Sequence, residues 1–407
     1  MQTKLDRTAS IILFILCLIT IVFSLRFIHN QTKWSPIDEY SHMDYINKLS
    51  SGKLPRSSDQ ISLEMFFHIT TDTLRNPQRN MKTYQQLGLA AICYEAIHPP
   101  LYYALLTPPN MLMNKMGVKL FYRLKMLRLF SYAFFVIGMF ICIPLFKSLN
   151  KLGYSIPNSY GLGCTLFGLL LATHQRFGLG NNMLVPLMIN SAGIFLINYY
   201  HHPEDRTLYR FVLFVLLSIF TGLSTVFILP GLCIIMLLKY RSHFTVKNFA
   251  VITSMIIAAA LTFMFWKSAT IPDKNIDGYL QQFLTLYIPA GFADFKTFYG
   301  LWLHDAFTLS FIKNNFDIGV YVLAITGLSI IICIVYFKTL LKKLKWLISA
   351  GLLFLTFLIA AFLVNNYVAG VHWVAFRHYL GFIPVMYVMC TAFLLVLIEK
   401  YFKNSIE

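Results

Sequence analysis

Long apolar stretches alternate with short polar segments along the whole chain. A hydrocarbon core about 30 Å thick needs about 20 mostly apolar residues for each helical crossing, and stretches of roughly this length recur throughout the sequence. Hydropathy therefore predicts about ten membrane-spanning helices. We expect them at residues 9–28, 129–147, 157–174, 181–200, 209–223, 224–239, 248–266, 318–337, 346–365 and 378–398.

One further apolar segment, residues 98–116, is broken by prolines. It opens with Pro99 and Pro100 and contains Pro108 and Pro109, which interrupt regular helical hydrogen bonding. We interpret it as an interfacial helix that lies along the membrane surface, with an eleventh crossing as the alternative. A basic run overlaps its end and continues beyond it: Lys115, Lys119, Arg123, Lys125 and Arg128.

Basic residues near the chain ends predict the orientation. Lys4 precedes the first span and Lys400 follows the last, so the positive-inside rule places both termini in the cytoplasm and requires an even number of spans. The extracytoplasmic segments are then 29–128, 267–317 and 366–377. The basic run at 115–128 does not fit this assignment and would favour a cytoplasmic loop there. Other basic residues fall on the cytoplasmic side: Lys147, Lys151, Arg206, Arg210, Lys239, Arg241, Lys247, Lys338, Lys342, Lys343 and Lys345.

The composition agrees with a membrane protein. Hydrophobic residues make up 57% of the chain and charged residues 13%, and the mean hydropathy is +0.63, which is far from the usage of soluble domains. The net charge of +17 needs no nucleic-acid partner, because anionic lipid of the inner leaflet attracts cytoplasmic basic residues. We therefore expect an all-α, polytopic protein of the plasma membrane, with residues 1–407 forming a single domain.

Several function classes are disfavoured. The predicted spans carry no Asp, Glu or Lys in their middles, whereas ion-coupled carriers place ionisable groups there. A P-loop, a dinucleotide fingerprint and a serine-nucleophile elbow are all absent from the sequence. No His, Cys and Asp residues stand at metal-ligand spacing, so no metal cofactor is predicted, although a divalent ion stays possible. Cys93 is the one cysteine predicted outside the spans, which excludes an intrachain disulfide there.

Chemically distinctive residues gather in the first extracytoplasmic segment, residues 29–128. The sequence SPIDEYSHMDYI predicts a short amphipathic helix over residues 37–49 with Asp38 and Glu39 in its first turn, where the helix dipole favours carboxylates. The alternative is that Asp38 is merely an N-terminal helix residue and that Glu39 is solvated. The same segment later contains His-Pro-Pro-Leu-Tyr-Tyr at residues 98–103.

The order and spacing of these two motifs resemble the membrane glycosyltransferases of the GT-C superfamily, which use sugars linked to polyprenyl phosphate. Enzymes of the protein O-mannosyltransferase and aminoarabinose-transferase-like group carry an acidic pair after the first span and an H/K/Q-P-P-L element later in the same loop. A third likeness is Arg377-His378-Tyr379-Leu380, followed by Pro384. The resemblance implies sugar transfer from a polyprenyl-phosphate donor to a glycan, lipid or protein acceptor of the cell envelope.

The chain also departs from that pattern. Relatives commonly place an acidic pair at the outer start of a middle span, where this chain has Asn181 and Asn182 in GLGNNMLVPL. The second carboxylate is missing, which puts a metal site or a second acid in doubt. A non-catalytic protein that binds lipid-linked glycan, and a transporter or flippase for such lipids, therefore stay open as alternatives.

The resemblance suggests roles for individual residues. Asp38 is expected to act as general base and Glu39 as its orienting or acceptor-binding neighbour, in a single displacement that inverts the anomeric centre. Arg377 is the first candidate for the donor phosphate, because a guanidinium forks onto phosphate oxygens; interfacial anchoring is its alternative. Further candidates for donor phosphate or acceptor are His98, Tyr102, Lys53 and Arg56. The alternative for His98 is a loop histidine that caps the following helix, and the alternative for Lys53 and Arg56 is simple solvation.

The second extracytoplasmic segment, residues 267–317, is rich in aromatic residues, including Tyr299 and Trp302. Aromatic side chains concentrate at membrane interfaces, so the segment is expected to lie there. It could shape a groove for the polyprenyl chain or a sugar, or it could serve only as a belt of interfacial anchors.

Overall fold

The structure, a computed structural model, describes residues 2–31, 39–56, 59, 61, 93–152, 158–173, 178–222, 225 and 245–270. The helices in these ranges belong to one compact unit, which comprises Met1–Leu223 and Val246–Ile276. Every regular element within the described ranges is helical. Apart from Thr225, the spans predicted at 224–239, 318–337, 346–365 and 378–398 lie outside the described residues, as do Asp38, Arg377 and most of the segment 267–317.

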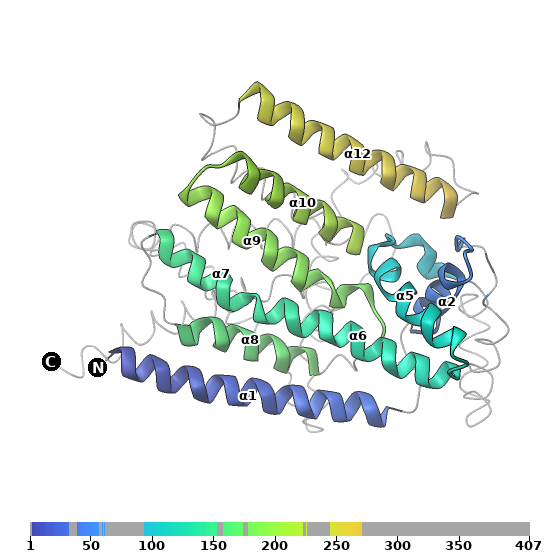
Figure 1. Cartoon of the computed structure of the whole chain (residues 1–407), viewed down its shortest axis with the longest axis horizontal. Helices are drawn as coiled ribbons and strands as arrows, with labels where there is room; N and C mark the ends of the chain where they lie inside the picture. The colour runs from blue at the N-terminus through green and yellow to red at the C-terminus, as the bar shows by residue number, and fades with distance from the viewer. Residues whose placement is uncertain are drawn as a thin grey trace, which may run out of the picture. The chain divides into compact units, whose positions relative to one another are not determined.

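Long helices form the body of this unit (Figure 1). Each of the six remaining predicted spans coincides with a helix or a helix pair. These are α1 (Gln2–Asn30), α6 (Leu120–Phe140) continuing into α7 (Cys142–Leu149), α8 (Asn158–Thr173), α9 (Val185–His201), α10 (Asp205–Thr221) and α12 (Val246–Thr270).

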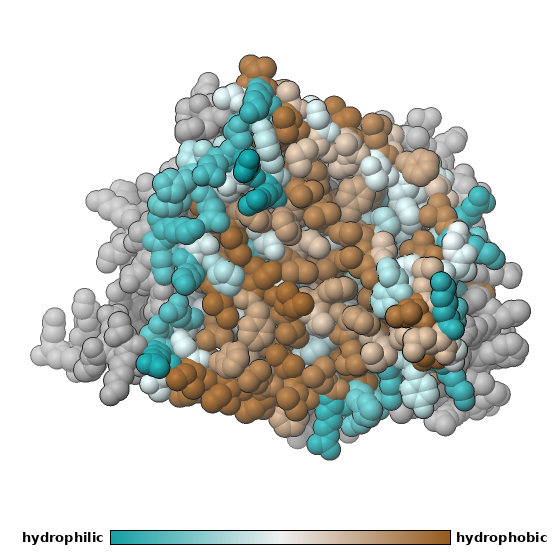
Figure 2. Space-filling model, viewed as in Figure 1, coloured by the Kyte–Doolittle hydropathy of each residue, from teal (hydrophilic) through white to brown (hydrophobic). Residues whose placement is uncertain are grey.

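Four helical stretches are long and apolar enough to cross a membrane: Asp6–Asn30, Leu120–Leu149, Asn181–His201 and Val246–Thr270. Helices α8 and α10 are shorter, at 16 and 17 residues. Large apolar side chains cover much of the outer surface, for example Phe23 on α1 and Leu261 on α12, which are 65% and 61% exposed. A broad apolar band bordered by polar residues is visible in Figure 2. This surface is compatible with a lipid environment.

One end of the helices carries those basic residues predicted to face the cytoplasm that the structure describes. The Asp6 carboxylate accepts the backbone N–H of Ser159 at 3.0 Å, so α1 and α8 begin together. Lys247 pairs with Asp205 at 3.2 Å, so α10 and α12 also begin side by side. The helix ends at this side of the unit (Figure 1) carry Lys4, Arg7, Lys147, Lys151, Arg206, Arg210 and Lys247. The cytoplasmic location of this end stays a prediction.

Shorter helices pack at the opposite end of the bundle. They are α2 (Glu39–Ser50), the 3-10 turns η1 (Tyr94–Ile97) and η3 (Asn181–Met183), and α5 (Leu101–Lys115). Helix α2 agrees with the helix predicted at 37–49, and α5 with the interfacial helix predicted at 98–116. Both contribute to a shared core in which Met43, Tyr45, Tyr103, Leu106 and Leu124 are at least 97% buried. These parts of the first predicted extracytoplasmic segment therefore fold onto the bundle.

Candidate functional site

Glu39 and Arg128 form a buried ion pair. The guanidinium of Arg128 contacts both carboxylate oxygens of Glu39, with Nε donating to Oε1 at 2.7 Å and Nη2 donating to Oε2. Both side chains are fully excluded from solvent. Such two-pronged pairing satisfies two charges that would be costly to bury separately. Glu39 is therefore a buried structural partner of α6, and the interpretation of this residue as a solvated helix-start carboxylate is wrong.

The same pair connects further chain segments. Glu39 Oε1 also accepts the backbone N–H of Leu179 at 2.9 Å, and Arg128 Nη1 donates to the carbonyl of Gln31 at 3.1 Å. The end of α1, the start of α2, the middle of α6 and the approach to α9 thus meet at one point. Arg128 stands in the basic run that did not fit the predicted orientation. Its partner is a carboxylate, so its charge gives no argument for a cytoplasmic loop.

Tyr102 joins the His-Pro-Pro-Leu-Tyr-Tyr motif to the segment before α9. Its hydroxyl pairs with Ser131 Oγ at 2.8 Å and accepts the backbone N–H of Gly180 at 3.0 Å. Gly180 directly follows Leu179, whose backbone N–H binds Glu39, and directly precedes Asn181 and Asn182. These asparagines stand where relatives in the family carry an acidic pair. Asn181 and Asn182 are themselves buried. The acidic pair, the His-Pro-Pro-Leu-Tyr-Tyr motif and the segment that leads into Asn181 and Asn182 therefore lie next to one another.

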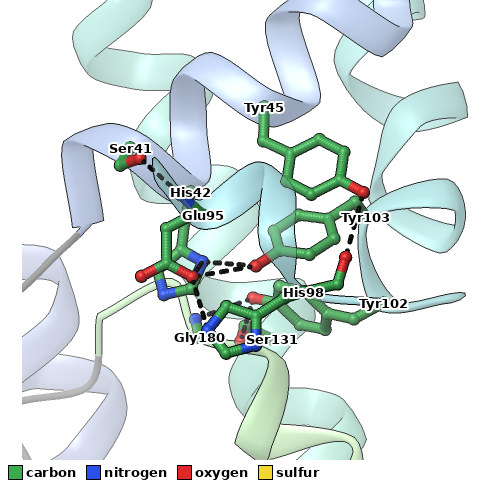
Figure 3. A network of polar contacts seen from close by, with 9 residues as sticks. All are labelled: Ser41, His42, Tyr45, Glu95, His98, Tyr102, Tyr103, Ser131 and Gly180. Atoms are coloured by element: carbon green, nitrogen blue, oxygen red, sulfur yellow. Dashed lines mark hydrogen bonds and ion pairs between the residues drawn. The ribbon is translucent and has the colours of Figure 1, made fainter. Parts of the chain in front are cut away.

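Beside this junction lies a cluster of polar side chains around Glu95 (Figure 3). Its Oε2 atom lies 3.1 Å from His98 Nε2, 3.4 Å from the Tyr103 hydroxyl and 3.5 Å from His42 Nδ1. His42 Nδ1 is also 2.7 Å from the Tyr103 hydroxyl. The backbone N–H of Glu95 donates to Ser41 Oγ at 3.3 Å. The cluster joins α2 to η1 and α5.

The Tyr103 hydroxyl lies between two partners, Glu95 Oε2 and His42 Nδ1. It has one proton, and the tautomer of His42 determines the direction of the shorter contact, the one to His42. Burial raises the pKa of Tyr103 well above its ordinary value, and the charge of Glu95 adds to that effect. The phenol therefore stays protonated at neutral pH.

The candidate residues from the sequence separate into three groups. His98 and Tyr102 lie within the polar site, and Glu39 lies in the ion pair beside it. Lys53 and Arg56 are exposed on the stretch after α2. Asp38 and Arg377 fall outside the described residues. Whether any of these residues acts in catalysis or binding stays a prediction.

Sequence reasoning missed three members of the site: Arg128, His42 and Glu95. Two of them carried a usable signal. Glu95 stands three residues before His98 and His42 three residues after Glu39, a spacing that places side chains on the same side of one helical turn. Arg128 carried none, because its partner lies 89 residues away.

Cys93 precedes η1 and is fully buried. Burial raises the pKa of its thiol, and the nearby Asp44 carboxylate raises it further. Since the thiolate is the reactive form, we expect Cys93 to react with a membrane-impermeant maleimide at least about tenfold more slowly than an exposed thiol. The measurement is labelling followed by mass spectrometry at pH 8. Ser51→Cys, at an exposed position after α2, is the reference. Equal labelling of the two sites would contradict the burial of Cys93.

Within the described ranges, no group of three or more His, Cys, Asp or Glu side chains is placed to hold a metal ion. The site as described is a set of hydrogen-bonded carboxylate, imidazole and phenol groups at the end of a helical bundle. Neither the scan against protein-family models nor the search of curated proteins finds a match to this sequence.

Proposed function

We propose that this protein is an inverting membrane glycosyltransferase that moves a sugar from a polyprenyl-phosphate donor to an extracytoplasmic acceptor. The observation that carries the proposal is the meeting of three distant elements. Glu39 of the acidic pair accepts the backbone N–H of Leu179, and Tyr102 of the His-Pro-Pro-Leu-Tyr-Tyr motif accepts that of Gly180. His42 and Tyr103 both contact the carboxylate of Glu95. Titratable and hydrogen-bonding side chains that meet in this way are the groups from which an active site is built.

The proposed reaction is a single displacement. The acceptor oxygen forms a bond to the anomeric carbon while the bond from that carbon to the donor phosphate breaks. Asp38 takes the proton of the acceptor hydroxyl, and the polyprenyl phosphate leaves with its added negative charge. Arg377 and His98 are the proposed partners of that phosphate, because cationic donors stabilise developing charge on a leaving group.

Glu39 acts in this proposal as the orienting neighbour of Asp38. It is the first residue of α2, and its carboxylate is bound by Arg128 and by the backbone of Leu179. These bonds hold the start of α2, which directly follows Asp38 in the sequence. With both oxygens of Glu39 bound within the protein, orientation is favoured over acceptor binding.

The test is sugar transfer by the purified protein in lipid, with a panel of labelled polyprenyl-phosphate sugars and a crude envelope fraction as acceptor. We expect Asp38→Asn to lower the transfer rate by about 100-fold or more, since a general base contributes about 10² to 10⁴. Asp59→Asn is the matched control. Asp59 is partly exposed, and the bond that it accepts from the Arg56 backbone is one that Asn also accepts. Asp59→Asn should transfer at the wild-type rate.

Two outcomes would contradict the proposal. Absence of transfer from every donor by the folded wild-type protein would favour a non-catalytic binder of lipid-linked glycan. Movement of a lipid-linked sugar across vesicle membranes without formation of a new glycosidic bond would favour a flippase.

A further inference from the structure

Asn181 and Asn182 bury two side-chain amides in the turn η3, directly before α9. These residues are only 3% and 9% exposed. Neither amide has a hydrogen-bond partner among the residues that the structure describes. Buried polar groups in proteins are nearly always paired, because an unpaired one lowers stability. The two amides therefore keep their hydrogen-bonding capacity for a further group.

The glycine at position 222 leaves space beside both amides. Gly222 directly follows the last residue of α10 and has an extended backbone, with a φ of −155°. A Cβ atom added there would lie 3.6 Å from Asn182 Oδ1, 3.8 Å from Asn181 Nδ2 and 3.5 Å from Val185 Cγ2. These are ordinary van der Waals distances. A group of the size of a methyl or a hydroxyl therefore fits between these residues.

The atoms that border this space favour a hydroxyl group. Asn182 Oδ1 only accepts hydrogen bonds, and Asn181 Nδ2 only donates them. A hydroxyl both donates and accepts, whereas a cation would meet the N–H group and an anion would meet the carbonyl oxygen. The nearby charge of Glu39, which binds the N–H of Leu179, is already balanced by Arg128. The site therefore suits an uncharged ligand that carries hydroxyl groups.

The segment that carries the amides is held in place by its own contacts. The backbone N–H of Leu179 donates to Glu39 at 2.9 Å, and that of Gly180 donates to the Tyr102 hydroxyl at 3.0 Å (Figure 3). The N–H of Met183 donates to the Gly180 carbonyl at 3.1 Å. Gly180 is half-buried, and a Cβ atom there would meet nothing within 4 Å. Open space thus adjoins a segment that is already ordered, which lowers the entropic cost of binding.

We propose that Asn181, Asn182 and Gly222 form a subsite that binds a hydroxyl group of a neutral sugar. The choice of a sugar among hydroxyl-bearing ligands rests on the proposed function. No covalent bond is made or broken at this subsite. Its role is specificity, because an analogue that lacks the hydroxyl would leave both buried amides unpaired.

Sugar binding by the purified full-length protein in nanodiscs tests this proposal without relying on sugar transfer. The probes are the methyl glycosides of glucose, mannose, galactose and N-acetylglucosamine with their monodeoxy analogues, and binding is measured by saturation-transfer NMR. We expect the wild-type protein to bind at least one glycoside, and to bind one of its deoxy analogues about tenfold or more weakly. Asn181→Leu and Asn182→Leu should each nearly abolish this preference. A ratio of two affinities does not depend on the fraction of folded protein.

Gly222→Ala tests the same space without removing either amide. Its methyl group fits at ordinary contact distances, so the variant should fold like the wild type and lose the hydroxyl preference. This variant keeps the proposal testable if the leucine variants do not fold. Asn198→Leu is the matched control on α9. Its amide already binds Lys151 at 2.9 Å, away from η3, and this variant should keep the wild-type preference.

The proposal is overturned by three results. These are an unchanged hydroxyl preference in Gly222→Ala or in both leucine variants, absence of glycoside binding by the wild-type protein, and displacement of the glycoside by calcium or by glucuronate at equal concentration. Failure of the proposed function has a different signature. A hydroxyl preference that depends on the amides, in a protein that transfers no sugar, would uphold the subsite and reject the glycosyltransferase. Normal transfer without such dependence would do the reverse.

Discussion

Glu39→Gln and Arg128→Met are each expected to destabilise the folded protein by about 3–5 kcal/mol, the largest effect of any single change proposed for this chain. Each replacement leaves one charge buried without its ionic partner. In Glu39→Gln the guanidinium of Arg128 keeps only polar contacts, and in Arg128→Met the carboxylate of Glu39 keeps the Leu179 backbone bond alone among those described above. The measurement is the free energy of unfolding in mixed detergent micelles.

Two comparisons identify burial of an unpaired charge as the cause. The double variant Glu39→Met with Arg128→Met removes both charges and should recover much of the stability, because apolar side chains often replace a buried ion pair without loss. Lys247→Met breaks the ion pair between Lys247 and Asp205, whose side chains are 73% and 45% exposed. Solvent screens this pair, so the free energy of unfolding should stay at the wild-type value. A double variant that is less stable than either single variant would refute this explanation.

Gly138→Ala is expected to destabilise the packing of α6 against α9 by about 1–3 kcal/mol, the usual cost of forcing extra volume into a packed interior. A Cβ atom at Gly138 would lie 2.5 Å from the backbone nitrogen of Leu187 and 2.9 Å from its Cα. Backbone atoms cannot rotate away, so the helices must separate. Separation would stretch the bond from Asn190 Nδ2 to the Gly138 carbonyl, now 2.8 Å. Thermal unfolding in lipid nanodiscs measures the loss.

Gly193→Ala is the matched control on the same helix, α9. The added Cβ would lie 3.0 Å from Leu145 Cδ1, the end of a flexible, half-buried side chain. We expect a change within about 0.5 kcal/mol, because a small adjustment of Leu145 relieves the contact. Equal destabilisation by the two alanines would show that loss of glycine, rather than close backbone contact, is responsible.

The helices of the described unit were predictable from the sequence, because the backbone hydrogen bonds that form a helix join residues close together in the chain. A run of apolar residues in lipid must satisfy its own backbone hydrogen bonds, and a helix does so within the segment. The ranges 129–147 and 248–266 accordingly coincide with parts of α6–α7 and α12. The observed helices extend beyond the apolar ranges, since the polar residues at their ends continue the same hydrogen-bonding pattern.

The candidate site was predictable only in part. Motif spacing and resemblance pointed to Glu39, His98 and Tyr102, and the structure places these residues in the ion pair and the polar site beside it. Their partners were not foreseen. In the sequence, Arg128 is one of several basic residues in a run, and Glu95 is one of several carboxylates in a polar segment. Nothing in this pattern distinguishes either residue from its neighbours. Hydropathy treats both as water-facing, whereas both are almost fully buried.

The sequence by itself therefore determined the helical class, the positions of the apolar helices in the described ranges and the segment that carries the distinctive motifs. Tertiary structure alone decided which charges are buried and with whom they pair. Hydropathy and helix periodicity report interactions within a few residues, while the contacts of Glu39 span 89 residues to Arg128 and 140 to Leu179. A carboxylate with such partners is stable in the interior, and without them it would remain in water.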